Sequence, residues 1–154
     1  MEKFSASAAG VATGTDKTIL NLFNPAATPT RRARIFDVLI GSVATPADVA
    51  IRMHIARTTA VGTEGAGFTP NNLDGGGPAG ECDAGVGVYS VEPTYAASKQ
   101  LLDFSFNQRA LARWVAAPGC ELVAAATQNY GLGLRSKSAS SGTPAVEATI
   151  LFEE

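Results

Sequence analysis

The sequence is poor in the residues that carry most metal and acid–base chemistry. It has one histidine and two cysteines among 154 residues. Zinc takes roughly three to four nitrogen or sulfur ligands, and His54, Cys82 and Cys120 are too few and too widely separated to supply them. A catalytic triad would have to use His54, which lies in the middle of an expected strand and has no nucleophile motif near it. We therefore expect no catalytic residue, no cofactor and no metal site.

Charge is also scarce. Charged residues make up 17% of the chain, against a typical share of about 25%. The 12 basic and 14 acidic side chains give a formal net charge of -2, so there is no overall field to hold a phosphate polymer or an anionic membrane. No apolar run approaches the roughly 18 residues of a membrane span. We expect neither nucleic acid nor a membrane as partner, and synthesis in the cytoplasm.

The N-terminus lacks the apolar stretch of a signal peptide and is dominated by small residues. We interpret residues 1–15 as a flexible arm and residues 16–154 as a single domain, since the length suits one independent core. Whether Cys82 and Cys120 form a disulfide stays open at this point.

Alternating apolar residues predict an all-β chain. Val146, Ala148, Ile150 and Phe152 fall on one side of an extended segment, which indicates a strand with one buried face. Similar patterns predict strands at 18–23, 34–40, 49–56, 86–92, 101–107, 121–126 and 131–137. This spacing gives about eight to nine antiparallel strands, as in a β-sandwich or barrel.

Three connections carry more specific expectations. Residues 34–40 and 49–56 are predicted to form a hairpin, with Ile51 and Met53 inward and His54 outward. Residues 93–100 suggest a short helical turn. Residues 62–87 form a long glycine-rich loop, which is either functional or disordered, and Phe68 suggests that part of it is pinned.

Few polar groups stand out as candidates for binding. Arg31, Arg32 and Arg34 form the only dense basic cluster, which is either a solvated strand end or a contact for an acidic protein. Arg109 and Arg113 carry the same ambiguity, whereas Trp114 is expected near the core. Carboxylates around the glycine-rich loop could in principle bind calcium, but they lack the register of a calcium loop: Asp74, Glu81 and Asp83.

Several segments, taken in order, resemble a known family. A strand ending in Asn-Pro precedes a basic strand, and a strand ending in Arg-Thr-Thr precedes a glycine-rich loop. A Trp-Val-x-x-Pro-Gly stretch then precedes Gly-x-Gly-x-Arg, and the end of the chain is acidic. These motifs lie at residues 19–25, 34–38, 51–59, 113–119, 131–135 and 146–154. In this order and spacing the chain is similar to the small jelly-roll head proteins of tailed bacteriophages.

The resemblance implies a single jelly-roll β-sandwich that acts as a capsid cement or decoration protein. Such a protein would sit on the outer surface of the virion, would bind the major capsid protein, and would be a homotrimer, with a dimer as the alternative. The family has no shared catalytic residues. Candidate capsid or subunit contacts are then the N-terminal arm with Phe4, the arginines Arg31, Arg32 and Arg34, and Phe68 in the long loop.

Two other classes of function stay open. A carbohydrate-binding or receptor-binding jelly roll would need exposed aromatic platforms, for which Tyr89, Tyr95 and Tyr130 are the candidates. A glycoside hydrolase would need two carboxylates held about 5 to 9.5 Å apart. The acidic residues lie mostly in expected loops and at the termini, so this is the weaker of the two.

Overall fold

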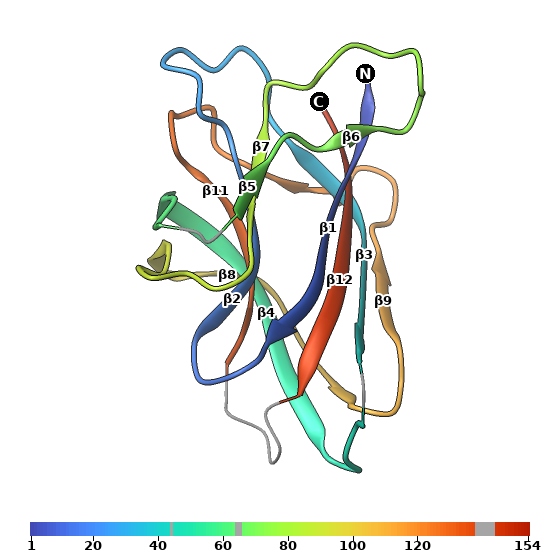
Figure 1. Cartoon of the computed structure of the whole chain (residues 1–154). Coiled ribbons are helices and arrows are strands. Elements are labelled where there is room, and N and C mark those ends of the chain that lie inside the picture. Colours follow the sequence, from blue (N-terminus) through green and yellow to red (C-terminus); the bar gives the residue numbers. More distant parts are fainter. Residues whose placement is uncertain (44, 64–65, 138–143) are drawn as a thin grey trace.

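The chain folds as a sandwich of two antiparallel β-sheets (Figure 1). The structure, a computed structural model, describes residues 1–43, 45–63, 66–137 and 144–154. Within these ranges the chain is all β and contains no helix. The strands, in chain order, are β1 (Lys3–Ala12), β2 (Lys17–Phe23), β3 (Arg34–Ser42), β4 (Ala50–Ala60), β5 (Ala66–Phe68), β6 (Asn71–Asn72), β7 (Asp83–Val86), β8 (Thr94–Asn107), β9 (Ala112–Val115), β10 (Leu122–Val123), β11 (Gly131–Ser136) and β12 (Ala145–Glu153).

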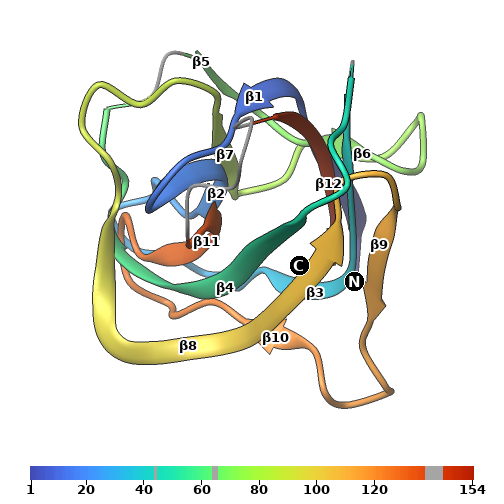
Figure 2. The same cartoon turned by 90° about the horizontal axis from the view of Figure 1, so that it is seen from below.

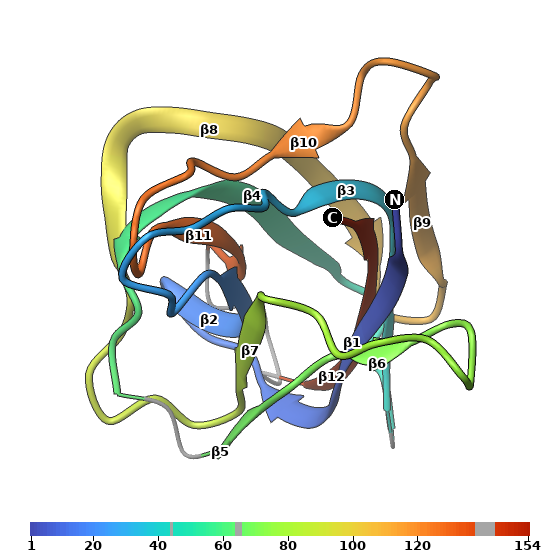
Figure 3. The same ribbon diagram turned by 90° about the horizontal axis from the view of Figure 1, so that it is seen from above.

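The two sheets are built from strands that are mostly distant in sequence. Sheet A has the order β10-β3-β12-β1-β6, with β9 also paired to β3, and sheet B has the order β5-β7-β2-β11-β4-β8. Viewed along the strands, the sheets form two facing layers with the termini close together (Figure 3). The all-β prediction and the antiparallel sandwich are confirmed.

The core lies between the sheets and follows the alternation of the sequence. Val146, Ala148, Ile150 and Phe152 of β12 are all buried, as predicted. They face apolar residues of sheet B, including Ile51 of β4. Fully burying a valine, isoleucine or phenylalanine side chain contributes about 1.5 to 3 kcal/mol, so the period-two pattern decides which face of each strand turns inward.

The flexible arm predicted at residues 1–15 is wrong. Lys3–Ala12 form β1, which pairs with the last strand, β12, on one side and with β6 on the other. Phe4 and Ala6 are fully buried, and the Phe4 ring stacks on Phe152 with centroids 5.5 Å apart. In the sequence the small residues of this segment suggest flexibility. In the structure they allow the segment to pack closely within sheet A.

The predicted hairpin of residues 34–40 and 49–56 is also wrong. These segments are β3 and β4, which belong to different sheets: β3 pairs with β12, β9 and β10, and β4 pairs with β11 and β8. The turn between them therefore crosses from one layer to the other. Alternation fixes the inward face of a strand but not its neighbour, so the pattern alone could not choose between these pairings.

The helical turn predicted for residues 93–100 is a strand. Thr94–Asn107 form the long edge strand β8, which bends through a corner in Figure 2. Ser98 has a φ of 54° and the β4–β8 register shifts on both sides of it. Left-handed backbone and bulges bend a strand without ending it. The bend interrupts the alternation of apolar residues, which is why the sequence here did not predict a strand.

The glycine-rich segment at 62–87 contains three short strands, β5, β6 and β7, and its residues 64–65 lie outside the described ranges. β6 adds to the edge of sheet A beside β1, whereas β5 and β7 add to sheet B beside β2. The strand predicted at 86–92 is wrong: β7 ends at Val86, and of the later residues only Val91 forms a bridge, an isolated one with Thr63. The segment therefore ties the two sheets together along one side.

Candidate binding surfaces

The loop between β2 and β3 presents two exposed arginines, Arg31 and Arg32. Within the described ranges, neither side chain has an ion-pair partner. Arg34, predicted as the third member of this cluster, differs: it begins β3, is half-buried, and lies 3.6 Å from Glu153 through Nη1 and Oε1. Of the three predicted arginines, Arg31 and Arg32 are therefore free to pair with a partner protein, whereas Arg34 already contacts Glu153.

The carboxylate of Glu81 holds this loop. The backbone N–H groups of Thr30 and Arg31 donate to it at 3.0 and 2.7 Å, and the Thr30 hydroxyl donates at 3.1 Å. These bonds, led by the one from the Thr30 backbone, lower the pKa of Glu81. The Glu81 N–H in turn donates to Glu154 at 2.6 Å. Glu81, itself held by Glu154, therefore fixes the backbone of the loop at residues 24–33, which we call the arginine loop.

Asn24, the residue at which β2 gives way to this loop, closes its other end. Its side-chain oxygen accepts from the Ala26 N–H at 2.9 Å, and its amide donates to the Arg31 carbonyl at 3.3 Å. Its own N–H donates to the carbonyl of Tyr130 at 3.4 Å. Asparagine forms turns of this kind because its short amide reaches the backbone two residues on. The loop is therefore a fixed platform and not a free tether.

Phe4 and Phe68, the two aromatic contact candidates, have different surroundings. Phe4 is fully buried in the core, so the folded chain does not present it to a partner. This corrects its assignment as a contact residue. Phe68 is half-buried in β5 and packs against the core cluster, which fits the expectation that part of the long loop is pinned.

His54 is buried although it points away from the core. It follows Met53 on β4 and turns to the outer face of sheet B, as predicted, yet its side chain is only 1% exposed, so the outward position is not open to solvent. Arg135 of β11 donates from Nε to His54 Nε2, and its guanidinium carbon lies 3.9 Å from the ring centroid of Tyr95. The two side chains therefore cover the imidazole.

This environment keeps His54 neutral. Burial, then the positive charges of Arg135 and Lys137, lower its pKa to about 4. Because Nε2 accepts from Arg135, the proton sits on Nδ1, which faces Asp103 Oδ1 at 3.8 Å without a hydrogen bond within the described residues. A charged imidazole here would oppose the guanidinium directly.

The sequence did not reveal that Tyr95 and Arg135 pack against His54. Tyr95 fits over β11 because Gly133 lies beneath it, where a Cβ would overlap the tyrosine hydroxyl. That hydroxyl also pairs with the Thr18 hydroxyl at 3.0 Å. The signal was present, since a glycine at an outward position of a strand marks a close approach. What it could not reveal was which residue approaches.

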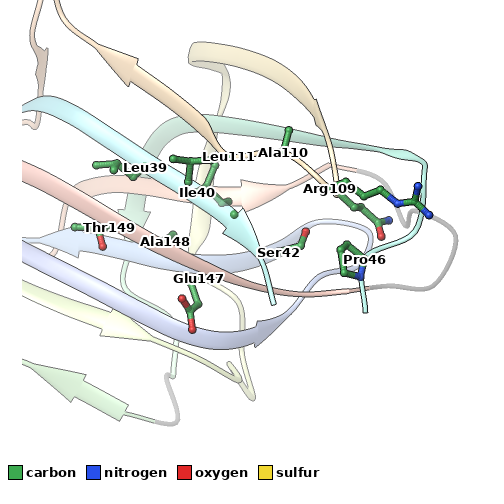
Figure 4. Close-up of a pocket in the computed structure, with 12 residues that line it drawn as sticks. Leu39, Ile40, Ser42, Pro46, Arg109, Ala110, Leu111, Glu147, Ala148 and Thr149 are labelled. Carbon is green, nitrogen blue, oxygen red and sulfur yellow. The ribbon is translucent and has the colours of Figure 1, made fainter. Parts of the chain in front are cut away.

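A groove of about 430 Å³ crosses the outer face of sheet A (Figure 4). Leu39 and Ser42 of β3, Glu147 and Thr149 of β12, and the 108–111 segment line it, with Leu111 over its middle. No aromatic side chain is among its described lining residues. The mixture of leucines, hydroxyls and charges suits contact with a protein surface more than stacking of a sugar ring.

The candidates for sugar or calcium binding are mostly occupied or buried. Tyr89 is 5% exposed and Tyr95 lies in the His54 network, so only Tyr130, at 36%, offers an open ring face. The Glu81 carboxylate is held by the arginine loop, and Asp83 accepts from Thr69 at 3.3 Å. Within the described ranges, no three His, Cys, Asp or Glu side chains gather as a metal site.

Comparison with known proteins adds no relative. No family model, curated protein or solved structure matches this chain. In the part of the chain that the structure describes, there is no helix of the length and hydropathy needed to cross a bilayer. Cys82 and Cys120 are both free thiols, the first buried and the second exposed.

Proposed function

We propose that the protein is a non-enzymatic structural protein with a jelly-roll fold, a cement protein on the outer surface of a phage capsid. The strand order supports the fold. When β5, β6, β7 and β10 are set aside, sheet A reads β1-β12-β3-β9 and sheet B reads β2-β11-β4-β8. The first and last strands are neighbours, and successive strands of this set cross between layers except β4 and β8, which pair within sheet B, as in a double Greek key.

The fixed loop that carries Arg31 and Arg32 is the observation that supports the binding role best. Its backbone is held by Glu81 and Asn24, whereas both guanidinium groups are exposed. Pre-organised loops lose little entropy on binding, and guanidinium groups pair well with carboxylates across protein interfaces. An acidic patch of the major capsid protein is the partner that this loop would fit.

A cement protein stabilises a shell by mass action. Binding the assembled shell and not its separated subunits shifts the equilibrium toward assembly. Many modest contacts are enough, because a bound copy holds its other contacts at high effective concentration. We propose a homotrimer, with a dimer as the alternative, and light scattering of the purified chain would distinguish the two. The buried, neutral His54 is consistent with a role without chemistry.

The proposal is tested by adding purified protein to heads that lack it, taken from the virus that encodes it. Cosedimentation and cryo-imaging should show the protein at repeated positions on the icosahedral shell. Replacing Arg31 and Arg32 with glutamate should weaken binding at least about tenfold, which corresponds to about 1.4 kcal/mol. The control, with Lys17 and Arg52 replaced by glutamate, makes the same charge change at two other exposed positions that lie outside the loop and the groove. Absence of the wild-type protein from the shell would refute the proposal.

The second candidate, a carbohydrate-binding or receptor-binding module, is favoured by Tyr130. Its ring is exposed, and its carbonyl accepts the Asn24 N–H at the base of the arginine loop. An exposed aromatic ring could stack on a sugar, and the arginines of the same loop region would favour an acidic one. Binding on a glycan array that is lost on Tyr130→Ala, together with no attachment to heads, would favour this function over the first.

A further inference from the structure

On one side of the sandwich, sheet B ends in β8, and sheet A ends in β9, which shares the edge of β3 with the short strand β10 (Figures 2 and 3). Across the described residues, β8 pairs only with β4 and β9 pairs only with β3. Each strand therefore has a row of N–H and C=O groups without a neighbouring strand. Exposed edges of this kind are templates for pairing with another chain.

An apolar slot of about 380 Å³ lies between these two edges. Leu102 and Phe104 line it from β8, and Leu111 and Trp114 line it from the β9 side. Leu111 is 67% exposed, and the other three are half-buried. We call this feature the lateral seam. It combines an unpaired backbone with an opening into the core at the same place.

We propose that the lateral seam binds an extended segment of a partner protein, which adds as a strand to β8 along residues 101–107. Alternate side chains of an added strand point to the same face, so every second residue of the segment would enter the slot. Strand addition of this kind obtains affinity from the backbone and specificity from the pockets. A helix or a small apolar molecule could fill the slot but would leave the β8 edge unpaired.

The charges around the seam indicate what the segment carries on its other face. Two arginines on this side are already paired, Arg113 with Asp37 and Arg52 with Asp103. Lys99 and Arg109 are exposed and have no ion-pair partner within the described residues. The expected partner is therefore a segment in which apolar residues alternate with acidic ones. This inference does not depend on a capsid as the partner.

The test uses a synthetic peptide of about nine residues that alternates valine and glutamate, long enough to span the straight part of β8. Trp114 is the only tryptophan, so its emission reports directly on the slot. The peptide should shift this emission and slow amide hydrogen exchange in residues 101–107 at least about tenfold. A peptide of the same sequence, N-methylated at every residue, keeps the side chains but has no N–H to donate on either edge and cannot form the ladder, so it should do neither.

A pair of variants separates the seam from other apolar surface. Leu111→Asp should weaken peptide binding at least about tenfold. Leu73→Asp changes a leucine that is also exposed, at 53%, but lies in the β6–β7 loop away from the seam, and should bind as the wild type does. Equal binding of the N-methylated peptide, an equal loss in both variants, or no binding by the wild type would overturn the proposal. So would protection of residues 101–107 in the free protein through self-association, which would assign the edge to a second copy.

Discussion

Acidification should destabilise this protein through one side chain, His54. Its imidazole is enclosed on the outer face of sheet B by groups from every neighbouring element: Arg135 and Lys137 from β11 and its end, Tyr95 and Asp103 from β8, Asp16 from the β1–β2 turn, and Arg52 from β4. The two carboxylates favour a charged imidazole, but burial and the cations outweigh them and hold its pKa at about 4.

The sign and size of the effect follow from linkage. In the unfolded chain the His54 pKa returns to 6.5, so below that pH the unfolded state binds a proton that the folded state excludes until about pH 4. Stability from this group is therefore complete above 6.5 and is lost as the pH falls toward 4. At about 1.4 kcal/mol per pH unit, the loss is about 3 kcal/mol.

The measurement is urea unfolding of the wild type and of His54→Gln at pH 7 and pH 4. Glutamine keeps an acceptor for Arg135 and cannot titrate. Carboxylates such as Asp16, whose pKa is lowered chiefly by the hydrogen bond from Lys137, titrate in both proteins and largely cancel in the difference. The free-energy difference between the two proteins should shift by about 3 kcal/mol in favour of the variant at pH 4. A difference that does not change with pH would refute this reasoning.

Three further predictions concern packing and thiols. Phe4→Ala should lower the free energy of unfolding in urea by about 3 to 5 kcal/mol, because the ring is fully buried against Phe152. An unchanged urea midpoint would indicate that residues 1–15 are a flexible arm after all. Gly133→Ala should cost about 1 to 3 kcal/mol by displacing the tyrosine above it, whereas Gly75→Ala, which meets open space, should be nearly neutral; equal midpoints would contradict this. A thiol reagent should label Cys120 in the native protein and Cys82 only after unfolding, since burial raises the pKa of the Cys82 thiol; rapid native labelling of both would disprove its burial.

Local patterns were sufficient where one face of a strand is apolar and the other polar. The alternation from Val146 to Phe152 is reproduced residue by residue in β12. The same rule placed Ile51 and Met53 in the core and turned His54 outward. The rule did not predict that His54 is buried, because burial on the outer face depends on Tyr95 and Arg135, which lie 41 and 81 residues further along the chain.

The candidate surface was predictable only in part. The cluster of Arg31, Arg32 and Arg34 is visible in the sequence, but the contact with Glu153 that engages Arg34 spans 119 residues. The same holds for Glu81, which holds the arginine loop from 50 residues away. The sequence shows how many charged side chains a segment carries. Whether such a side chain is free to bind a partner depends on which distant residue packs next to it in the fold.

By itself the sequence determined the all-β class, the inward faces of the strands and the scarcity of metal-binding and acid–base groups, because these follow from composition and from a period of two. Only the tertiary structure decided that residues 3–12 are a strand paired with β12, that β3 and β4 lie in opposite sheets, and that β8 and β9 are edge strands. Strand pairing depends on contacts between segments far apart in sequence, and short-range alternation carries no information about them.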